Sequence, residues 1–525
     1  MQDIGVPEYS ATLGRKHKDV VTRNIMYPAG KGVFVHIKAD FEDSRDFYIA
    51  IEPDRLPTLD GLIREVDIIL MEFDAELRIA IDTDSRSKVL LEILNKICIV
   101  SSDAGKDSAN GNIKRTKNNQ MRVTPKEMIG LQYLIIREKI GLGPLQPVIS
   151  DPYIEDISCS GVGGLFVEHK IFGGLKASVG FATSEALDGF VIGLSERIGR
   201  PVTFREPIVD AVLPDGSRVN IVYGGDVSKR GSNFTIRKFA STPLSILDLI
   251  SFGGLTYEMA AYLSYILREE LNFFVSGETA SGKTTLINAC SGFINPTSKI
   301  VSIEDTPELQ VPHKNWVREV VRGTSKAVPG QDSSVTMMDL LKAALRQRPN
   351  WIIIGEIRGE EGAIAFQAMQ TGHACCATFH ASSVEKLIQR ITGHPISVPK
   401  TYVDNLNVVV IASAVRLPNG KPGRKVISIS EITGYDPSSD SFSYVEVFRW
   451  NPVTDKHEFP GFQNSYMLEQ VIAPKRGFTQ STRRKIYDEL NVRANVLRKL
   501  HEKGITNFYD FYNVLAKAYR EGLFR

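Results

Sequence analysis

The feature that most constrains this 525-residue chain is the octapeptide GETASGKT at residues 277–284. It fits the pattern GxxxxGK[ST], in which backbone N–H groups cradle phosphates, the lysine reaches the β and γ phosphates and the last hydroxyl binds Mg²⁺. The apolar run LNFFVS precedes it and TLINACSGF follows it, so we expect a strand, a loop and a helix. The amino end of that helix would attract an anion. The sequence therefore predicts a phosphate-binding loop rather than a glycine-rich turn before an ordinary helix.

Two other apolar runs end in carboxylates. Residues 351–356 read WIIIGE, where Gly355 takes the usual place of an aspartate and leaves Glu356 to help bind the metal. A solvent-facing glutamate at a strand end is the alternative. Residues 300–309 read IVSIEDTPEL, and Glu304 is the candidate to orient or deprotonate an attacking water. Asp305 and Glu308 are expected to cap the turn that follows.

The segment TGHACCATFHA at residues 371–381 supplies two histidines, His373 and His380. We expect them to sense the γ-phosphate or to tighten a subunit contact, with a purely structural pair as the alternative. Adjacent residues of a strand point to opposite faces, so Cys375 and Cys376 would make a poor metal chelate. All five cysteines lack CxxC spacing, which indicates neither a disulfide framework nor a zinc knuckle, and a reducing cytosol is expected.

The amino-acid composition of the chain limits the kinds of partner that it can bind directly. The chain has 63 basic and 61 acidic residues, a net charge of +2, which gives no support for binding nucleic acid or membranes through the charge of the whole chain. No apolar run approaches the ~18 residues that a membrane-spanning helix needs. Membrane association would therefore go through a partner.

The pattern along the chain predicts three folded regions joined by two linkers. Polar composition marks the linker at 101–120, and a second one is expected at 242–255. The first region is an α+β module, and the last alternates helices and strands as in a parallel α/β sheet, ending in two amphipathic helices separated near Gly504. The regions are 1–100, 121–241 and 256–525.

These motifs in this order resemble those of the secretion-superfamily ATPases, which drive type II secretion, type IV pili, type IV secretion and the archaellum. GETASGKTT is similar to the Walker A motif of that family, IEDTPEL to its Asp box, ALRQRPNWIIIGEIRG to its Walker B motif and TGHACCATFHA to its His box. IGLGPLQPVISDPYIEDISCSG and NFTIRKF resemble parts of its N-terminal PAS-like domain. The resemblance covers about residues 121–440.

The resemblance implies an α/β fold with a RecA-like P-loop core at 256–525, a PAS-like α+β domain at 121–241 and an accessory module at 1–100. It implies that Glu304 activates water, that Thr284 and Glu356 hold Mg²⁺ and that His373 and His380 read the nucleotide state. Arg218 and Arg237 would reach the phosphates from the N-terminal domain, unless they form surface salt bridges; Arg318 and Arg322 are further candidates. The implied ATP-binding residues are Gly277, Glu278, Thr279, Ala280, Ser281, Gly282, Lys283, Thr284 and Thr285.

The resemblance also implies a homo-hexameric motor that works through a polytopic membrane platform protein, with filament or secretion accessory proteins as further partners. The chain would be cytoplasmic and held at the inner face of the cell membrane by those partners. It lacks the four-cysteine zinc module common in bacterial type II members, and YIAIEPDRLPTLDGLIREVDII, from Tyr48, is similar to the archaeal branch.

Two other functions share the P-loop. A hexameric nucleic-acid translocase would need a basic groove with interleaved aromatic residues, and none is evident in a chain of near-neutral charge. A nucleotide-dependent switch or scaffold could lose one catalytic carboxylate, whereas this chain pairs Lys283 with both Glu304 and Glu356. We therefore expect an enzyme that hydrolyses ATP and binds no nucleic acid.

Overall fold

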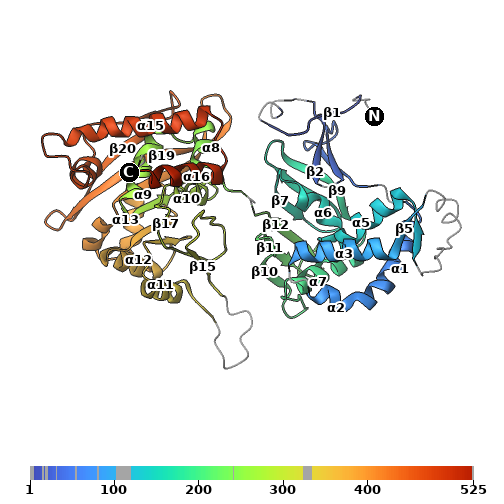
Figure 1. Cartoon of the computed structure of the whole chain (residues 1–525). Helices are drawn as coiled ribbons and strands as arrows, with labels where there is room; N and C mark the ends of the chain where they lie inside the picture. Colours follow the sequence, from blue (N-terminus) through green and yellow to red (C-terminus); the bar gives the residue numbers. More distant parts are fainter. Residues whose placement is uncertain are drawn as a thin grey trace. The chain divides into compact units, whose positions relative to one another are not determined.

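The computed structural model describes residues 5–14, 17, 20, 22–30, 32–53, 56–79, 82–101, 120–239, 242–322 and 334–522. The chain divides into two compact units, Met1–Ala240 and Ser241–Arg525 (Figure 1). The predicted linker at 101–120 lies outside the described residues, apart from its first and last positions. The predicted linker at 242–255 contains a short helix, α8 (Ile246–Ser251), which begins with a capping box at Ser245.

The first unit is built on a ten-stranded sheet, in the order β1-β2-β3-β4-β9-β8-β7-β12-β11-β10. A separate pair, β5 and β6, joins residues on either side of the predicted linker. The strands are β1 (Glu8–Tyr9), β2 (Asn24–Gly30), β3 (Val33–Lys38), β4 (Phe47–Ile51), β5 (Cys98–Val100), β6 (Met121–Val123), β7 (Ile154–Cys159), β8 (Gly163–His169), β9 (Gly173–Phe181), β10 (Ile208–Val212), β11 (Arg218–Val222) and β12 (Asn233–Arg237).

The helices of this unit pack into two apolar cores. One core lies along the large sheet, and the other joins α1, α3 and α5 to the β5–β6 pair. Helix α5 begins with Pro125 in its first turn and a capping box formed by Thr124 and Glu127. The helices are α1 (Leu59–Leu70), α2 (Asp74–Ile79), α3 (Thr83–Ile97), α5 (Pro125–Lys139), α6 (Gln146–Ser150) and α7 (Ser184–Arg197).

The large sheet is continuous across the predicted division near residue 120. Strand β4 pairs in parallel with β9, which puts Tyr48 opposite Ala177. A buried polar cluster lies beneath this junction. The carboxylate of Asp151, which has no exposed surface, accepts hydrogen bonds from the hydroxyls of Tyr27 at 2.7 Å and Tyr48 at 3.0 Å. Strands β2 and β4 are thereby tied to the segment that leads into β7.

The second unit is an α/β sheet in the order β15-β14-β16-β17-β13-β18-β19-β20-β21. Its first six strands are parallel and its last three antiparallel. The strands are β13 (Phe273–Ser276), β14 (Ile300–Glu304), β15 (Trp316–Val320), β16 (Trp351–Ile354), β17 (Ala374–Phe379), β18 (Val408–Arg416), β19 (Pro422–Asp436), β20 (Ser441–Asn451) and β21 (Lys456–Glu458).

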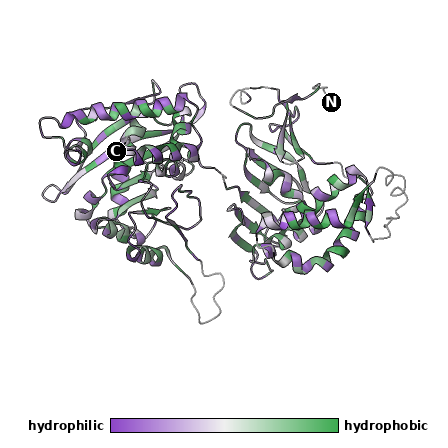
Figure 2. Ribbon diagram, viewed as in Figure 1, coloured by the Kyte–Doolittle hydropathy of each residue, from purple (hydrophilic) through white to green (hydrophobic). Residues whose placement is uncertain are grey.

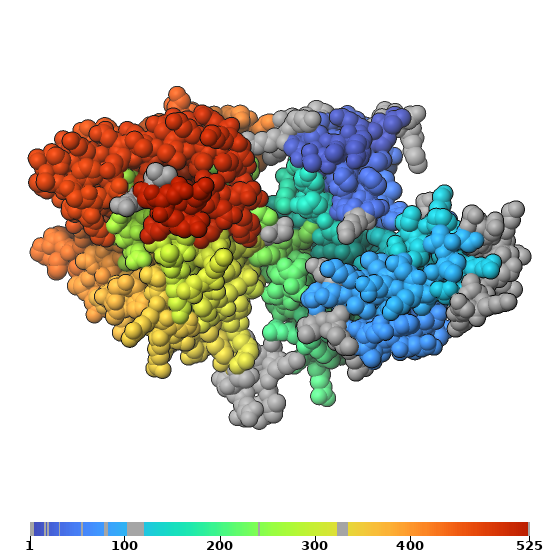
Figure 3. Space-filling model, in the orientation of Figure 1, coloured from blue at the N-terminus to red at the C-terminus, as the bar shows by residue number. Residues whose placement is uncertain are grey.

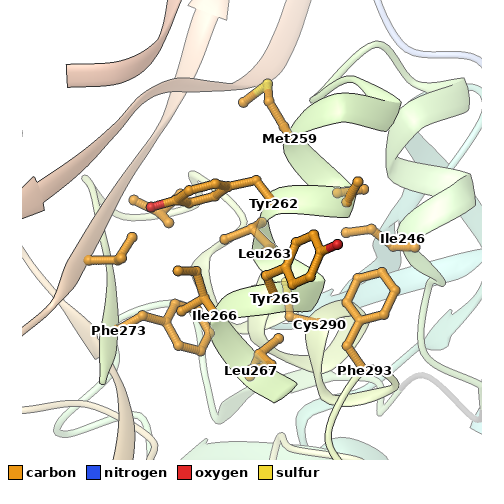
Figure 4. Packing of buried hydrophobic residues seen from close by; sticks show 14 of the residues in the cluster. Ile246, Met259, Tyr262, Leu263, Tyr265, Ile266, Leu267, Phe273, Cys290 and Phe293 are labelled. Atoms are coloured by element: carbon orange, nitrogen blue, oxygen red, sulfur yellow. The ribbon is translucent and has the colours of Figure 1, made fainter. Parts of the chain in front are cut away.

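Each parallel strand sends alternate side chains to opposite faces, as the period of a strand requires. Cys376 joins the core beneath α9 and α10, whereas its neighbour Cys375 joins the core beneath α11, α12 and α13. The prediction that the two cysteines point to opposite faces is confirmed. Figure 2 shows hydrophobic stretches in the strands of this sheet, and Figure 4 shows side chains of α9 within the first core. The remaining helices are α9 (Tyr257–Arg268), α10 (Lys283–Ser291), α11 (Met337–Arg346), α12 (Glu361–Gln370), α13 (Val384–Thr392) and α14 (Ala473–Lys475).

The two predicted C-terminal helices are present as α15 (Ile486–Glu502) and α16 (Phe508–Arg520), on either side of Gly504. Figure 3 shows these residues, in red, forming part of the surface of the second unit. Helix α16 packs on the carboxyl end of α10. The ring of Phe511 lies edge-on to Phe293, with centroids 5.9 Å apart, and the amide of Asn295 donates to the hydroxyl of Tyr519 at 2.8 Å.

The predicted α/β class with a P-loop core is confirmed by this sheet and by the strand, loop and helix at residues 273–291. The PAS-like character of residues 121–241 stays a prediction. Among the described residues, no helix combines the length and the apolar character that crossing a membrane requires.

Substituting Asp151 should weaken the first unit. Asp151→Ala leaves the buried hydroxyls of Tyr27 and Tyr48 without this acceptor, and each unsatisfied group costs about 1–3 kcal/mol. We expect the free energy of unfolding in urea to fall by at least about 2 kcal/mol. Glu155→Ala, at an exposed position of β7, is the control and should change little. Equal effects of the two substitutions would contradict a structural role for the cluster.

Candidate functional site

The loop between β13 and α10 is shaped by two glycines. A Cβ at Gly277 would lie 2.0 Å from the carbonyl oxygen of Ala412, so no larger residue fits there without a shift of β18. Gly282 has φ of +90°, in the region that favours glycine, and is the N-cap of α10. As a glycine, Gly282 has no side chain with which to cap this helix. The first-turn N–H groups, which have no partner within a helix, are therefore oriented as an anion site requires.

Lys283, the first residue of α10, is only 8% exposed and turns back over the loop. Its ammonium donates to the carbonyl oxygens of Gly277 at 3.1 Å and Glu278 at 2.9 Å. Burial lowers the pKa of this lysine from its ordinary value. The ammonium thus lies inside the curve of the loop, where it can reach a bound phosphate.

His380 and Glu356 extend this network. The Nδ1 atom of His380 lies 3.4 Å from the Nζ atom of Lys283, and its Nε2 atom lies 3.0 Å from Glu356 Oε1. Burial, helped by the charge of Lys283, lowers the pKa of His380. A neutral ring with its proton on Nε2 can accept from the lysine and donate to the carboxylate.

Arg358 makes a two-pronged contact with Glu356, through Nε at 2.6 Å and Nη2 at 2.7 Å. Burial raises the pKa of Glu356, but the hydrogen bonds from Arg358 and the nearby positive charges outweigh it, so the net pKa is lowered. Arg358 also lies 3.8 Å from Asp305, in the loop after β14. It therefore links the ends of β14 and β16.

Glu304, the last residue of β14, is 2% exposed, and both oxygens of its carboxylate have hydrogen-bond donors. Its Oε1 atom accepts from the backbone N–H groups of Glu308 at 2.7 Å and Leu309 at 2.8 Å, and Oε2 lies 3.5 Å from Nε of Arg318. Burial raises the pKa of this carboxyl group against the effect of those donors. The turn after β14 is thus capped by Glu304 itself, a role that sequence reasoning gave to Asp305 or Glu308.

The lack of a side chain at Gly355 allows the Glu304 side chain to lie in its observed position. A Cβ at Gly355 would lie 3.2 Å from Cγ of Glu304, closer than ordinary contact. The absence of a side chain at this position leaves room for the Glu304 side chain beside the next strand. Gly355, which sequence reasoning treated as a missing aspartate, is therefore a spacer.

Parallel strands place most of the predicted residues at one sheet edge. The phosphate loop, Glu304, Glu356 and His380 follow the carboxyl ends of β13, β14, β16 and β17. His373 is different. It precedes β17, whereas His380 follows this six-residue strand, and six residues of strand span about 20 Å. His373 contacts Thr371 there, 3.1 Å from its hydroxyl, and its predicted role stays a prediction.

Arg218 and Arg237 belong to the first unit, where β11 and β12 place them directly opposite each other. Nε of Arg237 lies 3.2 Å from Asp156 on β7. Arg318 contacts Glu304, as described above, and the backbone of Arg322 bonds to Val335. Among these four predicted arginines, Arg318 therefore contacts a predicted site residue, Glu304.

The residues of the loop are suited to binding a nucleoside triphosphate together with a divalent cation. The buried hydroxyl of Ser281 has no hydrogen-bond partner among the described residues, and a phosphate oxygen would provide one. Thr284, in the first turn of α10, and Glu356 offer the oxygen ligands that Mg²⁺ prefers. These side chains therefore suit a nucleotide and a divalent cation.

Three arginines around the site were not assigned a role from the sequence. The position of Arg358, two residues after Glu356, was the sequence signal that could have identified it as part of the site. The guanidinium of Arg390 donates to the carbonyl oxygen of His380 and lies over the ring of Phe379. Nε of Arg424 donates to the carbonyl oxygen of Ala280 at 3.0 Å. Arg424 is 144 residues from its partner, and no local pattern marks it.

Known proteins are similar to this chain over the region that carries the motifs. The family model described as "Type II/IV secretion system protein" matches residues 138–417. An uncharacterized protein of Methanocaldococcus jannaschii is 42% identical over 520 residues, covering 99% of this chain and 93% of that protein. The type IV secretion system protein PtlH of Bordetella pertussis is 32% identical over 273 residues, covering 48% of this chain and 79% of its own length. The VirB11 ATPase of Brucella suis is 25% identical, with a TM-score of 0.28, over 57% of this chain and 94% of that structure.

Substituting Gly277 should disturb the loop. Gly277→Ala forces a Cβ against the main chain of β18, and overpacking of this kind typically costs about 1–3 kcal/mol. Gly292→Ala, at the other end of α10, is the matched control because its new Cβ would meet neighbours only at 3.7 Å or beyond. We expect the urea midpoint to fall for the first variant and to stay near wild type for the second. Equal midpoints would contradict the close approach of Ala412.

Proposed function

Because this chain belongs to the family of type II/IV secretion system proteins, we propose that it is an ATPase motor of such a machine. The network of Lys283, His380 and Glu356 at the phosphate loop carries the proposal. It places the ammonium of the loop lysine and a carboxylate together at the phosphate loop, and a site that hydrolyses a triphosphate uses a lysine on the phosphates and a carboxylate near the metal.

Residues 277–285 would hold the phosphates of ATP, with the N–H groups of the first turn of α10 and the ammonium of Lys283 as donors. Lys283 would exchange the carbonyl oxygens of Gly277 and Glu278 for phosphate oxygens. Thr284 and Glu356 would help bind Mg²⁺, which neutralises charge on the β and γ phosphates when bound. Ser281 would gain an acceptor for its buried hydroxyl.

Glu304 and Glu356 would divide the remaining work. Glu304 would orient or deprotonate the attacking water, since it stands at a neighbouring strand end and Gly355 leaves it room. Its backbone donors, Glu308 and Leu309, keep its carboxylate in one orientation. Glu356 would remain ionised beside Arg358 and His380, as a metal-binding group must.

Arg218 and Arg237 would supply positive charge to the phosphates from the first unit. Strands β11 and β12 set these two arginines opposite each other, which concentrates positive charge at one place in the first unit. An arginine supplied in this way stabilises charge that develops during phosphoryl transfer.

The motor would act as a homo-hexamer on a polytopic membrane platform protein, with filament or secretion accessory proteins as further partners. It would work at the cytoplasmic face of the membrane and drive a pilus-like filament, an archaellum or a secretion system. Its relative in Methanocaldococcus jannaschii, which matches nearly the whole chain, supports the archaeal branch. His373, away from the phosphate edge, would contribute to a subunit contact.

Removal of the loop lysine tests the proposal. Lys283→Ala deletes the buried ammonium, and loss of one such stabilising group costs on the order of 10²-fold or more in turnover. Phosphate release from ATP is the measurement. Glu304→Gln is the companion variant: it should lose turnover while still binding a fluorescent ADP analogue. Near-normal hydrolysis by Lys283→Ala would show that the loop is not the site.

The proposed role of the two first-unit arginines predicts a different effect on turnover than on nucleotide affinity. Arg218→Ala and Arg237→Ala should lower ATP turnover by about 10³-fold while changing ADP affinity far less, because they act on charge that develops in the reaction. Arg230→Ala, which replaces another arginine of the first unit, is the control. If affinity and turnover fall together, the two arginines do not act on the transition state.

A further inference from the structure

One hairpin of the second unit touches both ends of the phosphate loop. Strand β18 brings the carbonyl oxygen of Ala412 against Gly277, where no Cβ fits. Strand β19 brings Arg424 to the other end, where Nε donates to the carbonyl oxygen of Ala280 at 3.0 Å. The Cδ atom of Arg424 also lies 3.7 Å from where a Cβ on Gly282 would stand. Both strands of the β18–β19 hairpin therefore contact the loop.

Ala280 is the part of the loop that most needs support. Its φ of +62° lies in the left-handed region, which glycine adopts readily and alanine does not. A residue with a side chain stays in that conformation only when its surroundings hold it. The hydrogen bond from Arg424 fixes the carbonyl group of this residue. It thereby fixes the peptide that leads into Ser281, whose buried hydroxyl has no partner among the described residues.

Arg424 is itself placed by a rigid strand. It pairs with Ala414 in the β18–β19 ladder. The next residue, Lys425, is 6% exposed and forms an ion pair with Asp455 at 2.7 Å. The N–H of Val426 then donates to the carbonyl oxygen of Gly254 at 2.8 Å. The backbone beneath Arg424 is thus fixed on both sides, while its guanidinium is exposed beside the amino end of α10.

We propose that Arg424 is a positioning residue for nucleotide binding, which holds the phosphate loop in its binding conformation through the carbonyl group of Ala280. This inference rests on the proposed ATPase function. Arg424 acts on the loop and not on the reacting phosphate, so it sets the affinity for ADP and ATP. Glu304 and Glu356, which would carry the chemical step, are not among its contacts described here.

The test compares Arg424→Gln and Arg424→Lys with Arg416→Gln, an exposed arginine on the other strand of the same hairpin. Full-length proteins are titrated with a fluorescent ADP analogue, and ATP turnover is measured over a range of concentrations. We expect both Arg424 variants to raise Kd and KM about tenfold while kcat changes less than threefold. Lysine does not substitute because its side chain has a carbon, and no N–H donor, at the position of the arginine Nε. Arg416→Gln should match wild type, and melting temperatures should agree throughout.

A second variant separates positioning from direct contact with the nucleotide. Ala280→Gly removes the penalty for the left-handed conformation, so the double variant Arg424→Gln/Ala280→Gly should recover part of the lost affinity. No recovery would assign Arg424 to direct nucleotide contact and overturn the positioning role. Wild-type affinity in Arg424→Gln, with hydrolysis intact in the parent protein, would overturn the inference alone. Failure of the parent protein to bind ADP would overturn the proposed function as well.

Discussion

The convergence of parallel strand ends is the constraint on which the site depends. Strands β13, β14, β16 and β17 run side by side in one direction, so the residues that follow them meet at one edge of the sheet. Groups far apart in the sequence, such as Lys283 and His380, come within hydrogen-bond range in this way. Backbone pairing alone therefore delivers an ammonium, two carboxylates and an imidazole to the same place.

In these same strands, the residues that stabilise the fold are different from the residues that would bind and react with a ligand. Side chains within each strand go alternately to one core or the other, and both cores are apolar. The charged groups of the site stand at or just beyond the ends of these strands. A core substitution should thus affect folding first, whereas changes at the edge affect binding and turnover. Gly355 belongs to both classes, because its lack of a side chain is a packing feature that gives Glu304 its position.

Local patterns in the sequence predicted those elements of the fold that depend on residues close together in the chain. The strand, loop and helix around Lys283, the strand that ends at Glu304 and the strand shortly before Glu356 follow from apolar runs bounded by glycine or acidic residues. Contacts between distant segments were not predictable in this way. No pattern reveals that Arg424 meets Ala280, or that β4 joins β9 in one sheet, because pairing partners are chosen by the whole fold.

The packing of α16 on α10 has a consequence for how the protein is made. The hydroxyl of Tyr519 accepts from Asn295, a residue 224 positions earlier, and Phe511 covers Phe293 beside it. During translation, the helix that follows the phosphate loop leaves the ribosome long before the helix that covers it. Until the later helix emerges, an apolar patch stays exposed on the nascent chain. The second unit therefore completes its core only after most of it has been synthesised, which makes this surface a natural target for chaperones.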